Sequence, residues 1–125
     1  ICEPGNARNA ITISAYNPVN NAFYAQASRG FTPNGIIKPD VTAPGVEIFG
    51  PYPRGQYGTM TGTSVAAAVT TGIAALFLQQ FDVADLNGNI VPELLIRGAS
   101  PHGGEYPSRE WGYGTVDAYE SITFE

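Results

Sequence analysis

The longest mainly apolar stretch of the chain runs over 64–81, and its strongly polar residues, Gln79 and Gln80, lie near its end. It contains no proline, and its only glycine is Gly72. Alanines fill most positions between the larger apolar residues, and only Thr70 and Thr71 interrupt them. A helix that is apolar or small on every side is typical of a protein interior, so the pattern predicts a buried helix. The larger apolar residues recur at helical spacing, at Val65, Val69, Ile73, Leu76 and Phe77.

The remaining pattern predicts short strands separated by turns. Alternating β-branched residues favour a strand over 11–16, and short apolar runs favour two more at 40–42 and 46–49. The Gly, Pro and Tyr residues at 50–58 predict a loop.

A second helix is predicted over 92–97, with Pro92 at its first position and Gly98 as its stop. Short strands, loops and one further helix are too little to surround the helix at 64–81. We therefore expect the layer that covers this helix to be missing, although alanine also suits an exposed helix surface. Gly72 costs about 1 kcal/mol relative to alanine inside a helix, which favours a close neighbouring backbone there.

The composition fits one domain and excludes several classes of protein. The 125 residues are 43% hydrophobic, and 15 Gly and 10 Pro are dispersed without a repeat, which excludes collagen and low-complexity disorder. The sequence has no run of 18 consecutive apolar residues, so no membrane-spanning helix is predicted. A net charge of −5 without a basic cluster argues against nucleic acids and membranes as partners. Because the chain starts at Ile1 without a signal pattern, we expect it to be part of a longer protein.

Gly62, Thr63 and Ser64 lie where a loop passes into the first predicted helix. Unpaired N–H groups and the positive end of the helix dipole stabilise the negative charge that develops when a hydroxyl attacks a carbonyl. Ser64 is therefore a candidate nucleophile, and Gly62 would let a substrate backbone approach closely. Serine and threonine are also preferred helix N-caps, so a purely structural role is the alternative.

The residues alone give this serine no recognisable base. His102, the single histidine, lies in a Gly- and Pro-rich loop and is expected to be solvated. None of the carboxylates pairs with it in a recognisable motif. The acidic stretch 82–89 has some features of a calcium loop but lacks the required spacing to a terminal glutamate, so no metal site is predicted. The single cysteine, Cys2, excludes an internal disulfide.

Four segments, in this order, resemble conserved motifs of the subtilisin-like serine proteases, the subtilases. They are the turn and strand at 4–15 (PG followed by ITISA), 28–45 (SRG and KPDVTAPG), the serine motif at 62–68 (GTSVAAA), and 111–118 (WGYGTVDA). They span nearly the whole chain, and their combination is specific. One position departs from the family, because Ala68 stands where the serine motif usually has proline.

The resemblance implies that residues 1–125 form the C-terminal portion of a subtilase catalytic domain. The family fold is three-layer α/β, with a mostly parallel sheet and helices on both faces. It also implies a serine endopeptidase in which Ser64 attacks the scissile carbonyl and forms an acyl-enzyme. The family's triad Asp and His, and an Asn of its oxyanion hole, belong to upstream segments. The chain alone is therefore expected to be inactive.

Further site residues follow from the resemblance by position. Glu3 would favour a basic P1 residue if its carboxylate faces the P1 pocket. The bond between Glu3 and Pro4 is expected to be cis, as the family's matching bond is. The residues assigned to substrate binding are Cys2, Glu3, Pro4, Gly5, Gly62 and Thr63.

Because the triad Asp and His are not in view, a non-catalytic subtilase-like receptor or scaffold is the alternative function. The expected partners are a peptide or protein substrate and the upstream part of the same domain. The isolated chain should dimerise or aggregate, because a sheet edge and apolar surface would be uncovered. No cofactor is visible in the sequence. Calcium, and an extracellular or cell-envelope location, are implied by the resemblance alone.

Overall fold

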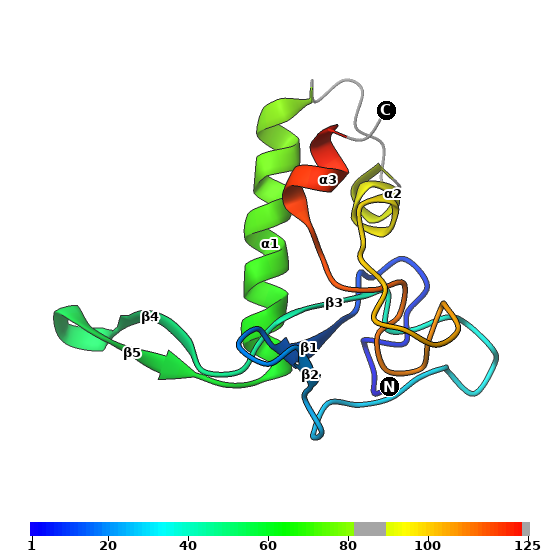
Figure 1. Cartoon of the computed structure of the whole chain (residues 1–125), viewed down its shortest axis with the longest axis horizontal. Coiled ribbons are helices and arrows are strands. Elements are labelled where there is room, and N and C mark those ends of the chain that lie inside the picture. Colours follow the sequence, from blue (N-terminus) through cyan, green and yellow to red (C-terminus); the bar gives the residue numbers. More distant parts are fainter. Residues whose placement is uncertain (82–89, 124–125) are drawn as a thin grey trace.

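A computed structural model describes residues 1–81 and 90–123 of the chain, and Figure 1 shows its elements. In the described residues the strands come first and the α-helices follow, and the presence of both confirms the α/β class. In chain order the elements are β1 (Ile13–Asn17), β2 (Ala22–Phe23), β3 (Val41–Pro44), β4 (Ile48–Tyr52), the single-turn helix η1 (Pro53–Gly55), β5 (Gln56–Met60), α1 (Thr63–Gln80), α2 (Ile90–Arg97) and α3 (Ala118–Thr123).

The central sheet has the strand order β2-β1-β3. Strands β1 and β3 are parallel, and Ile13 and Ala15 lie opposite Val41 and Ala43. Strand β2 pairs antiparallel with the end of β1 through only two residues. The strands predicted at 11–16 and 40–42 are thus confirmed within two residues, whereas β2 is too short to leave a pattern in the sequence.

The helices pack on one face of this sheet. Small side chains at Ala15, Ala43 and Ala66 let the start of α1 approach the strands closely. Farther along α1, Phe77 is fully buried and joins larger residues from the sheet and α2. This larger cluster consists of Val41, Phe77, Leu94 and Leu95. Helices on the second face of the sheet, which the family resemblance implies, stay a prediction.

Helix α1 confirms the predicted helix within one residue at each end. Only Ala66, Thr70 and Phe77 are buried along its length, while Leu76 and Leu78 are 48% and 50% exposed. The residues that the structure describes therefore leave one face of α1 uncovered, as expected. The close backbone expected at Gly72 is not supplied by the described residues, because a Cβ added there would meet no atom within 4 Å.

The length and apolar composition of α1 would also allow it to cross a membrane. The core helix of a soluble protein passes the same test, and α1 packs along β1 and β3. The contacts with β1 and β3 make α1 part of the α/β core.

The prediction of a loop over 50–58 is wrong. Strands β4 and β5 form an antiparallel hairpin in five pairs, from Ile48 opposite Met60 to Tyr52 opposite Gln56. The hairpin turns through Arg54 and Gly55, both at positive φ. The Gly and Pro content masked the strands, because backbone pairing needs little from side chains on a mostly exposed ribbon. Figure 1 shows the hairpin projecting sideways from the base of α1.

Helix α2 begins two residues before the predicted start, so Pro92 lies within its first turn. Its end is as predicted at Arg97, and Gly98 follows. A Cβ at Gly98 would lie 2.2 Å from the hydroxyl oxygen of Ser121, so the close approach of α3 excludes a larger residue there. Helix α3 itself was not predicted.

Candidate active site

The turn that carries Ser64 rests on the end of β3. The N–H of Gly62 donates to the carbonyl of Gly45 at 2.8 Å, and the N–H of Gly45 donates to the carbonyl of Tyr16 at 3.0 Å. A Cβ at Gly45 would lie 2.7 Å from the Cβ of Ala15 and 2.8 Å from the carbonyl oxygen of Gly62. A glycine at the end of KPDVTAPG therefore lets the sheet, the hairpin and α1 converge directly beneath Ser64.

Ser64 is the second residue of α1 and its side chain is exposed. The N–H groups of a first helical turn have no acceptor within the helix. The N–H of Ser64 can therefore donate to an oxyanion that forms next to its own hydroxyl, and the helix dipole favours negative charge at the same point. This geometry suits a nucleophile that attacks a carbonyl.

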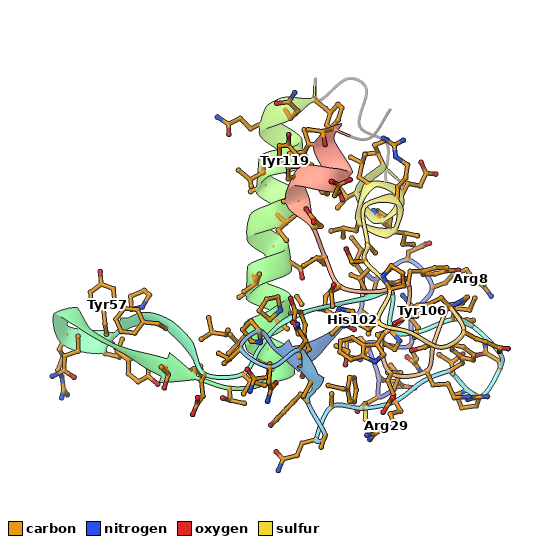
Figure 2. The ribbon with its side chains drawn as sticks, in the orientation of Figure 1. Arg8, Arg29, Tyr57, His102, Tyr106 and Tyr119 are labelled. Carbon is orange, nitrogen blue, oxygen red and sulfur yellow. The ribbon has the colours of Figure 1, made fainter. Side chains whose placement is uncertain are left out.

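The residues that the structure describes do not supply a base for this hydroxyl. None of them forms a hydrogen bond with the Oγ of Ser64. The Nε2 of His102 lies 3.2 Å from the Oγ1 of Thr115, and the imidazole stacks flat on the ring of Trp111 at 4.4 Å. In Figure 2, His102 and the hairpin that carries Tyr57 lie on opposite sides of α1. His102 is exposed, as predicted, but it is held in an aromatic cluster rather than free in solvent.

That aromatic cluster also contains Tyr16 at the end of β1. Its ring lies 5.9 Å from the rings of both His102 and Trp111. Burial, and secondarily the negative charge of Asp117, raise the pKa of Tyr16 above its ordinary value of 10.0. Tyr16 therefore stays a neutral phenol over the ordinary pH range and is not a candidate base.

A cavity of about 310 Å³ opens between the hairpin and the start of α1, and we call it the hairpin cavity. Its lining is almost entirely apolar, and Ser64 is one of the lining residues. The sequence does not predict this cavity, because the cavity depends on the hairpin, and the Gly and Pro residues at 50–58 predict a loop there. Its lining residues are Ile48, Phe49, Gly50, Pro51, Tyr52, Gly58, Met60, Ser64, Val65 and Ala68.

A second cavity of about 140 Å³, the N-terminal cavity, lies between the first residues of the chain and β1. Three of the predicted substrate-binding residues, Cys2, Gly5 and Thr63, meet in its wall, whereas Glu3 and Pro4 are exposed and do not line it. The bond between Glu3 and Pro4 is cis, as predicted. The complete lining is Ile1, Cys2, Gly5, Thr12, Ile13, Ser14, Ser28, Pro39 and Thr63.

Ser14 is a residue of this cavity that was not predicted. It is almost completely buried, and its Oγ has no hydrogen-bond partner among the described residues. With Thr12, Ser28 and Thr63 it gives the N-terminal cavity a hydroxyl-rich wall. One feature of the sequence could have identified Ser14: it is a polar residue between the apolar residues Ile13 and Ala15 at the start of a predicted strand.

Within the described residues, no group of three or more His, Cys, Asp or Glu side chains could hold a metal ion. The acidic stretch 82–89, which has some features of a calcium loop, lies outside the described residues.

Comparison with known proteins gives consistent matches. The subtilase family matches residues 1–114. Serine protease AprX of Bacillus subtilis is 36% identical over 98% of this chain and 31% of AprX. Pyrolysin of Pyrococcus furiosus is 33% identical over 86% of this chain and 8% of pyrolysin. The structure of the CspB protease of Clostridium perfringens has a TM-score of 0.89 and 32% identity, covering 96% of this chain and 27% of CspB.

The chain therefore spans no more than 31% of the length of these relatives. The close superposition on CspB confirms the fold class that the motifs implied.

Proposed function

This chain belongs to the subtilase family, and on that premise we propose that it is the C-terminal portion, residues 1–125, of the catalytic domain of a serine endopeptidase. The observation that carries the proposal is the exposed hydroxyl of Ser64 in the first turn of α1. Its family motif, its oxyanion-stabilising N–H and two adjoining cavities all meet there.

In the proposed reaction the Oγ of Ser64 attacks the carbonyl carbon of the scissile peptide bond. The proton of the hydroxyl passes to a base, and the N–H of Ser64 donates to the oxyanion. Breakdown of the intermediate expels the amine and leaves an acyl-enzyme, which water then hydrolyses to the acid. The base and the residue that orients it come from the upstream part of the domain, since the described residues offer Ser64 no partner.

The two cavities suit the two sides of the scissile bond. The N-terminal cavity adjoins Thr63 and takes the P1 side chain, on the acyl side. Its unpaired Ser14 hydroxyl favours a polar group there. The hairpin cavity adjoins Ser64 and takes an apolar side chain on the leaving side. Gly62, which has a φ of 156° that other residues rarely adopt, leaves room for the substrate backbone between them.

The uncovered face of α1 is the proposed docking surface for the upstream part of the domain. Leu76 and Leu78 are half exposed, and the space beside Gly72 is open. An apolar face of this kind is covered in a stable domain. The isolated chain should therefore be inactive and should dimerise or aggregate. Sedimentation at tens of micromolar tests this, and a well-folded monomer would contradict it.

A non-catalytic receptor or scaffold is the second candidate, favoured by Ala68 at a position where the family's serine motif usually has proline. The substitution restores a backbone N–H and removes a local stiffener without touching the nucleophile. The two candidates differ in whether the upstream segment carries both the Asp and the His of the triad. Calcium binding, and an extracellular or cell-envelope location, are further proposals that rest on family resemblance alone.

The proposed function is tested by hydrolysis of an unfolded protein substrate by the full-length protein. Ser64→Ala should lower the rate by more than about a thousandfold. Ser100→Ala is the matched control, because Ser100 is exposed and its contacts run through its backbone. Equal rates in both variants would refute the proposal.

A further inference from the structure

Lys38 carries the most deeply buried charge in the described part of the chain. Its side chain is 1% exposed, and its Nζ lies 2.8 Å from the Oδ2 of Asp40. The same ammonium group donates to the carbonyl of Ala10, from the opposite segment of the chain. A buried lysine is tolerated only when its charge is paired and hydrogen-bonded, so these two contacts are what hold it there.

The contacts continue beyond the ion pair. The Oδ2 of Asp40 also accepts the N–H of Thr12 at 2.7 Å, and the N–H of Asp40 donates to the carbonyl of Thr12 at 2.8 Å. The Oγ1 of Thr12 in turn donates to the carbonyl of Gly5. One connected set of polar contacts therefore runs from Lys38 through Asp40 and Thr12 to Gly5.

This network joins two walls of the N-terminal cavity. Pro39, between Lys38 and Asp40, lines one wall, while Gly5 and Thr12 line the other. Lys38 itself is not one of the residues that line the cavity. It acts on the cavity only through the segments that it holds together.

We propose that Lys38, paired with Asp40, is a positioning residue that fixes the shape of the N-terminal cavity and thereby the choice of P1 side chain. The inference rests on the proposed function, in which this cavity receives P1. Because the pair is desolvated, its attraction is screened less than that of a surface pair. Removing the ammonium would leave the Ala10 carbonyl without this donor and the Asp40 carboxylate with only the N–H of Thr12, and the segment over 1–10 would shift relative to Pro39.

The experiment uses the full-length protein and two variants, Lys38→Met and Asp40→Asn. The first removes the charge but keeps an unbranched side chain, and the second keeps an acceptor for the Thr12 N–H. Arg29→Met is the matched control, because it breaks an ion pair at 3.1 Å with Glu110 that is about half exposed on both sides. Such surface pairs contribute little.

Two readouts separate positioning from folding. The first is kcat and KM for peptides that differ only in the P1 residue. The second is the rate at which a small fluorophosphonate, which has no P1 side chain, labels Ser64. A displacement of the cavity wall should raise KM for the preferred peptide by about tenfold and flatten the P1 preference. Labelling should stay within about twofold of the unmodified protein in at least one variant, and Arg29→Met should match the unmodified protein throughout.

Three results would overturn the proposal. The first is an unchanged P1 preference in variants that still label. The second is an equal loss of kcat on every peptide together with loss of labelling in both variants, which would make the network purely structural. The third is an unmodified protein that is folded but not labelled, which would refute the proposed function itself and this inference with it. The third differs from the first two because it concerns the protein before any substitution.

Discussion

The hairpin cavity and the N-terminal cavity open beside adjacent residues, Ser64 and Thr63, but their walls are held in different ways. The hairpin is a two-stranded ribbon that projects from the base of α1 (Figure 1). Its Phe49 and Tyr57 rings stack at 5.6 Å, yet Phe49 remains 70% exposed. The N-terminal cavity is bounded by the central sheet and by segments that the buried ion pair of Lys38 and Asp40 holds together.

The difference suggests how the two sides should select substrate. A projecting apolar ribbon can adjust to several side chains, because few buried contacts fix its position. A wall fixed by buried, charged hydrogen bonds cannot move without leaving polar groups unpaired. The leaving side of the scissile bond should therefore tolerate variety, while the acyl side should be strict.

The largest expected effect comes from Gly45, which packs against the turn beside which both cavities open. In Gly45→Ala the new methyl group would overlap Ala15 and Gly62, so the free energy of unfolding should fall by about 3 kcal/mol. Both cavities would be disrupted together, because both depend on the turn at Ser64. Thermal unfolding measures the change. Gly50→Ala, where a Cβ meets no atom within 4 Å, should melt almost like the unmodified protein. Equal melting of the two variants would contradict the packing described at Gly45.

A smaller effect is expected from the hairpin wall. Phe49→Ala removes one ring of the stacked pair, and because Phe49 is mostly exposed, stability should fall by only about 1 kcal/mol. The preference for apolar residues on the leaving side should fall by about threefold, while the P1 preference stays the same. Peptide libraries varied on each side measure both. Tyr119→Ala, an equally exposed aromatic on α3, is the control. A change in P1 preference would show that the two sides are not independent.

Glu3 tests whether charge at the edge of the N-terminal cavity contributes to its selectivity. Its carboxylate is exposed and outside the lining, so Glu3→Gln should lower the preference for Arg over Leu at P1 by no more than about threefold. The difference should vanish at about 1 M salt, where exposed charges are screened. A tenfold loss that persists in high salt would mean that Glu3 enters the cavity when substrate binds.

The smallest effect concerns Tyr16, whose pKa is raised by burial and by Asp117. The unfolded chain releases this phenolic proton near pH 10.0, whereas the folded protein retains it to higher pH. The stability contributed by Tyr16 is therefore complete below pH 10.0 and falls as the pH rises through the folded-state pKa. Absorbance titration of the tyrosines should show one late phenol that Tyr16→Phe removes. An unchanged titration in Tyr16→Phe would contradict the shift.

The sequence predicted most accurately the elements that depend on neighbouring residues in the chain. Helix α1 follows from a proline-free stretch with helical spacing, and the end of α2 follows from Gly98. The hairpin at 48–60 was half missed, because its strands are stabilised by pairing with each other rather than by apolar alternation. The two-residue strand β2 has too few residues to carry a pattern at all.

The candidate site divides in the same way. Ser64 could be identified because its motif is contiguous, and Cys2 and Gly5 because a family motif marks the position of their segment. The cavity that joins them to Thr63 could not be predicted, because its walls come from residues far apart in the chain. The contacts of Lys38 with Ala10, and of Thr12 with Asp40, each span 28 residues. No pattern in the sequence at one residue of such a pair identifies the residue that it contacts.

The central claim is that Ser64 is a nucleophile activated by groups from the upstream part of the domain. The most direct test is labelling with a fluorophosphonate, applied to the full-length protein, its Ser64→Ala variant and the isolated chain of 125 residues. We predict that only the unmodified full-length protein is labelled, and that the label is found on Ser64. A folded full-length protein that does not react would contradict the claim, and Ser64 would then be only a residue of the first turn of a helix.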